Sequence, residues 1–571
     1  MLCVMGEALG PVDPFIGDRA PARPSSILPA AAAARPIDGL RPGSRAGTAL
    51  GVVRSSYSGQ MSSRVAIVGG GHNALVSAAY LARAGLDVTV LERLDHVGGA
   101  AVSVRPWDVD ARISRYSYLV SLLPEALIAE LGLNLELRSR TTASYTPYQG
   151  PDGPAGLLIE SVEGEATRQS FRDLTGDDRE YEAWTAFYAE VAALARVVAP
   201  TLLEPLPTEG SIREQVVERT WADLVRSPLG FAIEERFASD VVRGIVATDA
   251  LIGTIASMRE ESLIQNRCFL YHLIGNGTGE WRVPVGGMGA VTGELERVAR
   301  AAGARIRTCA AVTGIETRDD GATVRGEDFE IDVDWVLSGV APYVLAGLRS
   351  EHPPPKPLGG QLKVNLLVER LPRLRSGVEE AVAFAGTLHL DESYAELEAA
   401  HADAAAGRFP ARPPGEIYCH TLTDRSILGS ELAASAVQAL TYFGLHVPHG
   451  ALRHPDLARD AEHQFLRTLD AHLAEPIEPL MLKDARGATL MESKTPWEIE
   501  DELGMPGGHI FHGDLSWPWL TDGRPADNPA RRWGVATRHP RVLMAGSGAV
   551  RGGAVSGIAG HNAAQALLEM L

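Results

Sequence analysis

The chain has 571 residues, of which 45% are hydrophobic, and this length leaves room for more than one globular domain. Its formal net charge of −19 argues against a nucleic-acid partner, because phosphate backbones select basic surfaces. No stretch approaches ~18 uninterrupted apolar residues, so the sequence predicts no membrane span. Peripheral contact with a membrane stays open, because an apolar substrate could reside there.

The four cysteines, Cys3, Cys268, Cys309 and Cys419, are far apart in the sequence. Their separation excludes a Cys-x-x-Cys redox pair, and we expect no metal site because no zinc-ligand spacing is present. Isolated thiols are typical of a reducing compartment. We therefore expect a cytoplasmic protein, or one of the mitochondrial matrix if the source is eukaryotic.

Residues 1–60 are rich in Pro, Ala, Gly, Ser and Arg and show no periodic apolar pattern. We interpret them as a disordered extension, or as a misassigned start that precedes a true initiator at Met61. They contain no basic segment followed by an apolar one, so we expect no secretory signal.

Residues 69–74 have the sequence GGGHNA and lie between an apolar run at 65–68 and a segment with helical apolar spacing. A second apolar run follows at 88–91. The acidic residue Glu92 comes directly after it, about twenty positions after the glycines. This order of strand, turn, helix, strand and acid is typical of adenine-dinucleotide binding, whereas an ordinary glycine turn needs none of it. The glycines would let the backbone approach a pyrophosphate at the helix N-terminus, and the acid would bind a ribose hydroxyl. The residues predicted from this motif are Gly69, Gly71, His72, Asn73, Ala74 and Glu92.

A second glycine pair, Gly98-Gly99, follows the ribose acid closely. Side chains there would clash with a pyrophosphate, so glycine is a physical requirement of a second loop against the same group. Many two-domain flavoproteins have this loop and NAD dehydrogenases do not need it. It therefore favours FAD over NAD.

The remaining chain alternates between helical and mixed patterns. Residues 171–272 are predicted to be mostly helical, with amphipathic segments at 181–198 and 212–225. A Gly-Met-Gly turn at 287–289 opens a helix at 291–302, and we interpret it as a helix start rather than a second dinucleotide site. Strands are predicted at 304–308, 311–317, 322–325, 333–337, 361–370, 381–390, 416–423, 439–447 and 542–545, and further helices at 391–405, 455–473 and 557–570.

These patterns predict an α/β protein with a Rossmann-like dinucleotide-binding fold, a distinct mixed α+β block, and a return to the βα pattern at the C-terminus. The helix after the glycine-rich segment 546–553 would bring its N-terminus to the cofactor.

Five stretches carry a family resemblance: 67–78, 114–123, 286–290, 506–513 and 546–564. They resemble the phytoene-desaturase-like branch of the FAD-dependent amine-oxidase superfamily, over about residue 64 to the end. The resemblance implies a discontinuous Rossmann-like FAD-binding domain and an inserted α+β substrate domain, with a hydrophobic tunnel that reaches the flavin. The FAD-binding domain would comprise 61–165, 280–345 and 535–571, and the substrate domain 166–279 and 346–534. It also implies that Gly98, Gly99 and Ala100 lie at the pyrophosphate and flavin, and that Arg93 helps Glu92 to hold the ribose. Val312 would meet the adenine, and Gly546 and Val555 would meet the ribityl chain and the flavin edge.

The chain departs from the family pattern at three places. Typical amine oxidases carry arginine at the position of Ala100 and an acid at Ser547, which weakens an amine-oxidase assignment. Similar relatives carry His-Pro where Val550-Arg551 stands, which leaves the pocket beside the flavin undefined.

Lys363 lies in a segment, 357–364, that resembles the part of amine oxidases that places a lysine at the reactive flavin nitrogen. Two interpretations stay open, a catalytic lysine and a solvated lysine at the start of a strand. His72 is interpreted as a loop residue near phosphate rather than a base, and Trp517 and Trp519 as core.

The leading hypothesis is an FAD-dependent oxidoreductase that transfers hydride from a small hydrophobic organic substrate to flavin, phytoene dehydrogenase-like. One alternative is redox-neutral isomerisation of a polyene with reduced FAD. The other is a non-catalytic binding protein similar to the Rab GDP-dissociation inhibitors. The sequence indicates neither the substrate nor the electron acceptor nor the oligomeric state.

Overall fold

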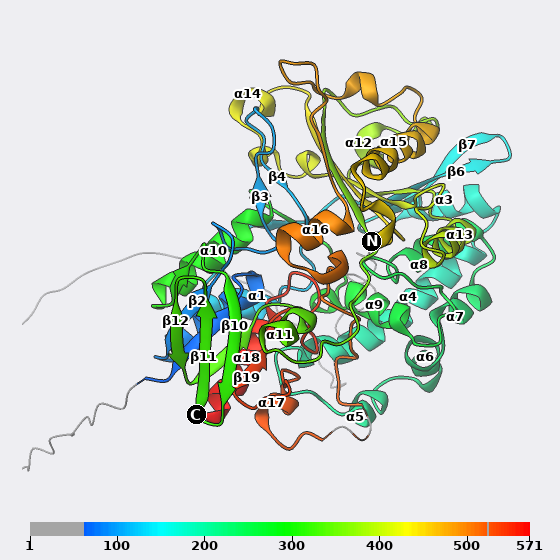
Figure 1. The fold of residues 1–571 in the computed structure, drawn as a ribbon. Helices are drawn as coiled ribbons and strands as arrows, with labels where there is room; N and C mark the ends of the chain where they lie inside the picture. The colour runs from blue at the N-terminus through cyan, green and yellow to red at the C-terminus, as the bar shows by residue number, and fades with distance from the viewer. Residues whose placement is uncertain (1–61, 522, 524) are drawn as a thin grey trace, which may run out of the picture. The chain divides into compact units, whose positions relative to one another are not determined.

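The computed structural model describes residues 62–571 except 522 and 524, so the predictions for residues 1–60 and Cys3 lie outside the described residues. The described chain contains two main sheets, a small antiparallel sheet and a helical region (Figure 1). No helix in this part of the chain is long and apolar enough to cross a membrane.

The first sheet is parallel throughout and has a buried core on both faces. Its strands, in spatial order, are β19 (Val542–Met544), β13 (Trp335–Ser338), β1 (Arg64–Val68), β2 (Asp87–Leu91) and β9 (Arg305–Arg307). The central strand β1 is an apolar run because a parallel strand covered on both faces has no solvated side. This sheet confirms the predicted Rossmann-like fold.

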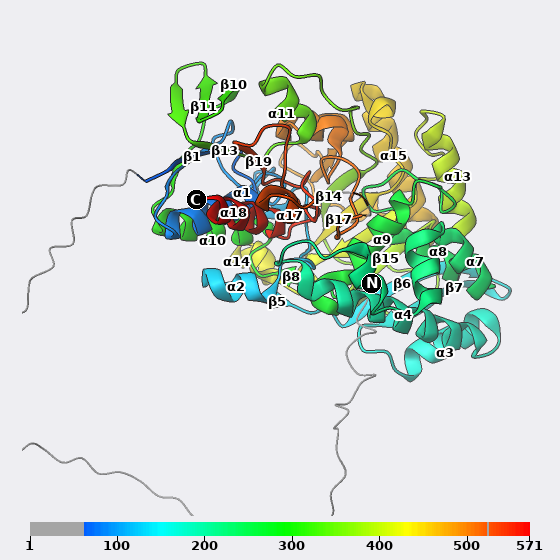
Figure 2. The ribbon, with the colours of Figure 1, turned by 90° about the horizontal axis from the view of Figure 1, so that it is seen from below.

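Three helices lie side by side along this sheet in Figure 2: α1 (His72–Arg83), α10 (Met288–Ala301) and α18 (Ile558–Met570). Small residues let α1 and α18 approach closely, since a side chain at Gly560 would collide with the backbone oxygen of Asn73. Helix α10 begins directly after Gly287, as predicted for the Gly-Met-Gly turn, and Thr292 Oγ1 donates a hydrogen bond to Ala101 O at 2.7 Å. That bond ties the helix to the segment that follows the second glycine pair.

The small antiparallel sheet lies beside the first, in the order β10 (Val312–Arg318), β11 (Gly321–Gly326) and β12 (Glu330–Val333). It is followed by β13 and then by α11 (Pro342–Leu348). The start of β10 brings Val312 to the edge at which the parallel strands end.

The second main sheet has seven strands. Its strands, in order, are β18 (Met491–Lys494), β14 (Leu362–Val368), β17 (Gln438–Gly444), β16 (Gly415–Cys419), β15 (Thr387–Leu390), β6 (Thr142–Gly150) and β7 (Gly153–Glu160). All neighbours are antiparallel except β15 and β6. Strand β14 is an interior strand of this sheet, since β17 and β18 pair with its two edges, and all of its residues are buried.

The hairpin β6–β7 belongs to this second sheet. The division that we predicted places residues 61–165 in the nucleotide-binding domain, but β6 pairs with β15 and not with the parallel sheet. Neither strand of the hairpin is among the predicted strands, since the residues of β6 do not alternate between buried and exposed positions. The rest of the domain division stays a prediction.

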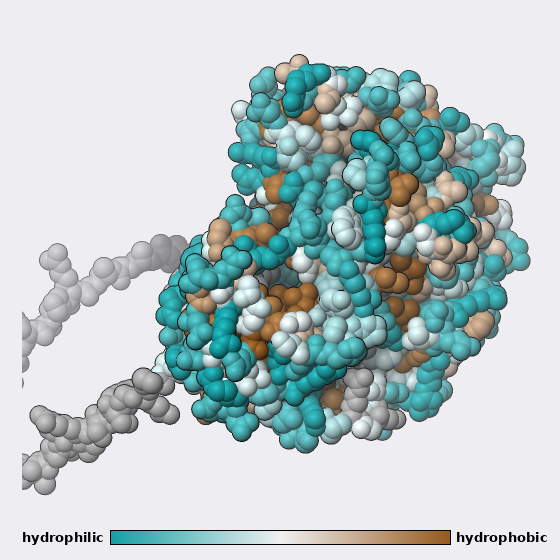
Figure 3. All heavy atoms as spheres, viewed as in Figure 1, coloured by the Kyte–Doolittle hydropathy of each residue, from teal (hydrophilic) through white to brown (hydrophobic). Residues whose placement is uncertain are grey.

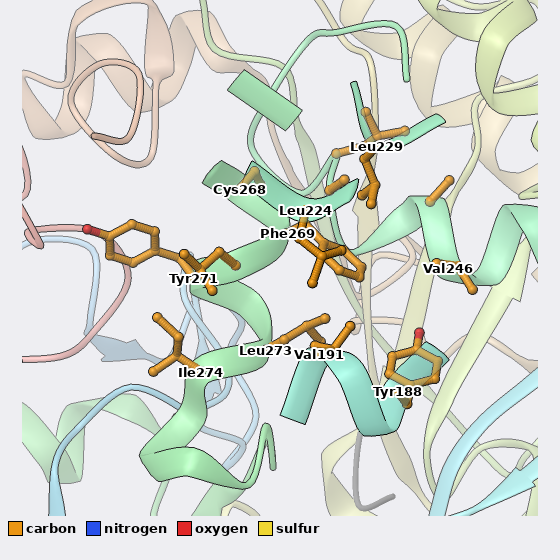
Figure 4. Close-up of a cluster of buried hydrophobic side chains, with 14 of the residues drawn as sticks. Tyr188, Val191, Leu224, Leu229, Val246, Cys268, Phe269, Tyr271, Leu273 and Ile274 are labelled. Atoms are coloured by element: carbon orange, nitrogen blue, oxygen red, sulfur yellow. The ribbon is translucent and has the colours of Figure 1, made fainter. Parts of the chain in front are cut away.

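Seven helices lie between β7 and α10 in the sequence and form the helical region. They are α3 (Glu165–Thr175), α4 (Arg179–Val198), α5 (Glu209–Arg213), α6 (Glu218–Trp221), α7 (Leu229–Arg236), α8 (Asp240–Thr248) and α9 (Ile264–Ile274). Their apolar faces meet in one cluster, in which Figure 4 shows Tyr188 and Val191 of α4 near Phe269 and Leu273 of α9. The single amphipathic helix predicted at 212–225 is wrong, because the chain there forms α5, α6 and a π-helical turn at Ala222–Arg226.

The remaining elements are short or cover the sheets. The strands are β3 (Ser103–Val104), β4 (Ile113–Ser114), β5 (Leu137–Arg138) and β8 (Val283–Pro284); the helices are α2 (Glu125–Leu131), α12 (Glu380–Ala383), α13 (Tyr394–Ala405), α14 (Ser430–Ala433), α15 (Pro455–His472), α16 (Pro496–Leu503) and α17 (Pro529–Arg532). The predicted strand at 381–390 is half wrong, because its first part forms α12.

Candidate functional site

A cavity lies at the carboxyl ends of strands β1, β2, β13 and β19, where open parallel sheets bind their ligands. Its walls also include α11, α16 and the start of β10. Figure 3 shows a hollow bordered by hydrophobic side chains in the region where Figure 1 places these elements. The predicted residues that line the cavity are Gly69, Gly71, His72, Asn73, Ala74, Glu92, Arg93, Gly99, Ala100, Val312, Lys363, Gly546 and Val555.

The two glycine loops contact each other directly. The Gly98 N–H donates a hydrogen bond to Gly70 O at 2.9 Å, and Gly71 pairs with Gly98 in a parallel bridge. Gly98 and Gly99 have φ values of +122° and +58°, in the left-handed region that favours glycine. Gly98 itself does not line the cavity; it supports the loop from beneath.

The N-terminus of α1 opens onto the cavity without a cap. No side chain caps it, and its first turn contains no acidic residue. Gly71 has φ −68°, which any residue adopts, yet a Cβ built there would meet nothing within 4 Å. Free backbone N–H groups, the positive end of the helix and space beside Gly71 together suit an anionic group such as a pyrophosphate.

Glu92 is buried at the end of β2, and the backbone holds its carboxylate. Oε2 accepts a hydrogen bond from Gly70 N at 2.6 Å, and Oε1 accepts one from Leu94 N at 2.9 Å. Each oxygen keeps a further acceptor site toward the cavity. Arg93, the neighbour of Glu92, directs its guanidinium to the backbone carbonyls of Asp501 and Glu502 at the end of α16, so its contacts are with that helix.

His72 begins α1 and bridges to the C-terminal loop. Its Nε2 lies 3.1 Å from Ala554 O, and since a carbonyl only accepts, Nε2 carries the proton. Burial lowers the pKa of His72 to about 4, so the ring is neutral at physiological pH. A neutral ring already bonded to the backbone agrees with the loop role that the sequence suggested.

The C-terminal loop between β19 and α18 forms the opposite wall. Ala545 N donates to Ser338 O at 2.8 Å, and a Cβ at Gly546 would lie 2.5 Å from Gly339 O, so only glycine fits between these two strand ends. Arg551 of this loop turns away from the cavity. It is buried with φ +67°, and its guanidinium bonds the carbonyl of Thr201.

Lys363 is 1% exposed, which excludes the interpretation of a solvated lysine. Its Nζ donates to Asn365 Oδ1 at 2.8 Å and to Thr441 Oγ1 at 3.2 Å, both from strands β14 and β17. Burial drives the pKa of Lys363 well below its ordinary value, although Glu492 opposes this shift. Burial thus favours the neutral form of the amine, which lies 4.8 Å from the centre of the Tyr118 ring, a further lining residue of the cavity.

The part of the cavity next to Lys363 is mainly apolar and aromatic. Sequence patterns did not identify its lining, because it comes from α9, the 510–512 segment and β17, which are distant in the sequence. The lining residues are Ile252, His272, Trp281, Phe443, Ile510, Phe511 and His512. His272 stacks on Trp281 with ring centres 5.3 Å apart, and burial lowers the pKa of His272 to about 4, so this wall carries no charge.

Other residues singled out in the sequence lie elsewhere. Trp517 and Trp519 stack on each other 5.0 Å apart within the helical core, as interpreted. The described cysteines, Cys268, Cys309 and Cys419, are all free thiols.

The residues present fit an adenine dinucleotide with a flavin. The open space beside Gly71 at the uncapped helix suits the pyrophosphate. The free acceptor positions of Glu92 suit the ribose, and the apolar far end of the cavity suits the flavin ring. The two loops that would face the pyrophosphate carry no side chain that would clash with it.

Comparison with known proteins supports the nucleotide-binding fold. Residues 67–124 match the family model of the NAD(P)-binding Rossmann-like domain. The uncharacterized protein Rv0897c of Mycobacterium tuberculosis is 47% identical over 524 residues, which covers 89% of this chain and 97% of that protein. Pyridine nucleotide-disulfide oxidoreductase domain-containing protein 2 of Rattus norvegicus is 28% identical over 565 residues, covering 88% and 93% of the two chains.

Among solved structures, cyclohexylamine oxidase from Brevibacterium oxydans superposes with a TM-score of 0.52. The match covers 89% of this chain and 99% of that enzyme at 15% sequence identity, so the likeness is one of fold. It confirms the predicted amine-oxidase type of architecture.

Proposed function

The chain belongs to the family that includes the mycobacterial protein Rv0897c and pyridine nucleotide-disulfide oxidoreductase domain-containing protein 2, and on this basis we propose that it is an FAD-dependent oxidoreductase. The substrate that we propose is a small hydrophobic organic molecule, from which hydride passes to the flavin. The phytoene-dehydrogenase-like character is part of this proposal.

One observation carries the proposal: a single cavity joins an anion-binding end to an apolar end. The first end is the uncapped N-terminus of α1 with the glycine loops, and the second is the aromatic wall around Trp281 and Phe443. A cofactor with a charged pyrophosphate and a flat ring suits this gradient, and an apolar substrate suits the space beyond it.

The residues of the first end bind and orient. The N-terminus of α1 and the loop at Gly99 would hold the pyrophosphate, and Glu92 would hold the ribose through oxygens already fixed by Gly70 N and Leu94 N. FAD, when bound, supplies the hydride acceptor. The protein contributes position, exclusion of water and a fixed electrostatic environment.

Lys363 is the group that we propose to handle protons at the far end. Burial favours the neutral form of this amine, and in that form the N–H groups donate to Asn365 and Thr441 while the lone pair is left as an acceptor. It can therefore orient a water molecule or hold a proton at Nζ in a site with few other polar groups. No acid–base pair is required, because the bond that breaks in the substrate is a C–H bond.

The proposal is tested by purifying the full-length protein, identifying the cofactor released on denaturation, and screening lipophilic compounds anaerobically for bleaching of the flavin absorption. Released FAD and bleaching by an apolar compound are the expected results. Isomer formation from a polyene without net oxidation would replace the reaction with the redox-neutral alternative. A protein that takes up no FAD even when it is added in excess would contradict the proposal and favour a binding protein.

A further inference from the structure

A second cluster of chemically reactive side chains lies in the seven-stranded sheet, outside the lining of the cavity. His389 on β15, Glu416 on β16 and Glu392 just after β15 are all at most 2% exposed. One donor atom from each lies within 4.8 Å of the other two. In the described part of the chain this is the one group of three such residues whose donor atoms come so close together.

The backbone places these donors. His389 and Glu416 are directly opposite each other in the antiparallel register of β15 and β16, so their side chains lie on the same face of the sheet. Glu392 returns to His389 through a turn at Asp391, which has φ +50°. Arg412 and His472 hold the Asp391 carboxylate at 2.7 and 2.9 Å and fix that turn.

The cluster is rich in acceptors and poor in cations. Nδ1 of His389 contacts Oε2 of Glu392, whereas Nε2 of His389 and Oε1 of Glu392 have no hydrogen-bond partner in the described residues. Asp249, at the end of α8, adds another buried carboxyl with an unpartnered Oδ2. Such buried lone pairs normally have a partner.

The neighbouring arginine does not supply this partner. The guanidinium of Arg140 lies over the Tyr418 ring, 5.4 Å from its centre, and donates to Thr387 Oγ1 at 3.3 Å. Among the described residues, no lysine or arginine forms an ion pair with Glu392 or Glu416. The hydroxyl of Tyr418 donates a hydrogen bond to Glu416 Oε2 at 2.5 Å.

We propose that His389, Glu392 and Glu416 bind a divalent transition-metal ion of the Zn²⁺ class. One imidazole nitrogen and two carboxylates are ligands that Zn²⁺, Mn²⁺ and Fe²⁺ accept, and two carboxylates neutralise the charge of the ion. No sequence motif indicates this site, because its three ligands have no recognised spacing and meet only through the register of β15 with β16 and the turn at Asp391.

The site lies close to the cavity wall. Tyr418 bonds Glu416 on one side, and its ring lies 4.8 Å from the ring of Tyr118, which lines the cavity. Metal binding would thus hold Glu416 and Tyr418 in place, and with them the surface on which the Tyr118 ring packs. This inference is independent of FAD, since no cofactor-binding residue is among the ligands.

The test measures metal on the full-length protein. The purified protein is freed of metal with a chelator, exchanged into buffer, and titrated with Zn²⁺ by calorimetry and with Co²⁺ by visible spectroscopy. We expect one ion per chain, a Co²⁺ ligand-field spectrum, and a loss of affinity of about 100-fold or more in His389→Gln and in Glu416→Gln. His446→Asn is the matched control, because His446 is equally buried with both ring nitrogens unpartnered, and it should bind metal as the wild type does.

Absence of stoichiometric Zn²⁺ and Co²⁺ binding to the wild type would overturn the proposal, and this result does not depend on whether any variant folds. Equal affinity in wild type, His389→Gln and Glu416→Gln would also overturn it, since the ion would then bind elsewhere. Thermal unfolding of each variant with and without Zn²⁺ provides a second readout: the wild type should gain stability from the ion and His389→Gln should not.

Discussion

The backbone N–H of Gly98 donates a hydrogen bond to the carbonyl oxygen of Gly70 at 2.9 Å, although the two residues belong to separate loops. This bond brings the second glycine pair against the N-terminus of α1. The two loops line the end of the cavity at which we propose that the pyrophosphate binds.

The substitution Gly71→Ala should weaken FAD binding without a large effect on the free energy of unfolding. Because Gly71 has an ordinary φ and open space at its Cβ position, we expect the free energy of unfolding to change by no more than about 1 kcal/mol. The added methyl group occupies space that the pyrophosphate needs, so the Kd for FAD should rise about tenfold or more. Fluorescence titration with FAD and denaturant unfolding measure the two quantities.

Two controls frame this experiment. Gly210→Ala, on exposed α5 with nothing near its Cβ position, should change neither quantity. Gly98→Ala should lose stability on the order of 1–3 kcal/mol, because its φ is +122° and its Cβ would lie 2.8 Å from Val102. Unaltered FAD affinity in Gly71→Ala would show that the pyrophosphate does not bind at this helix.

The second prediction concerns Glu92→Gln. The amide keeps one oxygen acceptor and loses the other, so either Gly70 N or Leu94 N loses its partner. We expect a cost of about 1–2 kcal/mol in the free energy of unfolding and a weaker hold on the ribose, seen as a higher Kd for FAD. A Kd equal to that of the wild type would contradict the ribose role and leave Glu92 as a purely structural acid.

The third prediction concerns Lys363→Met, which keeps the apolar stem and removes the amine. If Nζ handles protons at the reacting end, turnover or flavin reoxidation should fall about 100-fold while FAD binding stays. Lys494→Met is the matched control: Lys494 is opposite Lys363 in the register of β14 and β18 but is paired with Glu502, so its loss should affect stability more than turnover. Unchanged turnover and unchanged oxygen reactivity in Lys363→Met would contradict the catalytic role.

Much of the first end of the cavity could be predicted from sequence, because strand, turn and helix are local signals and the glycines occupy fixed positions within them. The burial of Lys363 could not, since its exposure depends on β17 and β18, which flank β14 only after the chain has folded. The same reason hides the aromatic wall and the register of His389 with Glu416. The hairpin β6–β7 shows the limit most clearly, because no sequence pattern predicted its strands or the pairing of β6 with β15.

The fourth prediction is a pH dependence of stability from His446. Burial, together with His401, lowers the pKa of His446 to about 3, whereas the unfolded chain binds a proton near the ordinary value of 6.5. Stability is therefore complete above about pH 6.5 and is lost as the pH falls toward 3, because only the unfolded state takes up the proton. In His446→Asn this contribution is absent, and asparagine tolerates the positive φ of 54°.

We expect the difference in unfolding free energy between wild type and His446→Asn to shift in favour of the variant by about 2 kcal/mol between pH 7.5 and pH 5. Denaturant unfolding at both pH values measures it. Other buried histidines titrate alike in both proteins and cancel in the difference. A pH-independent difference would mean that the ring of His446 is protonated in the folded protein.

The most direct test of the central claim is a crystal structure of the full-length protein grown with excess FAD. The account predicts the pyrophosphate at the N-terminus of α1 between Gly71 and Gly99, the ribose hydroxyls on Glu92, and the flavin ring toward Lys363. FAD bound at another place, or a cavity without FAD at a saturating concentration, would contradict it.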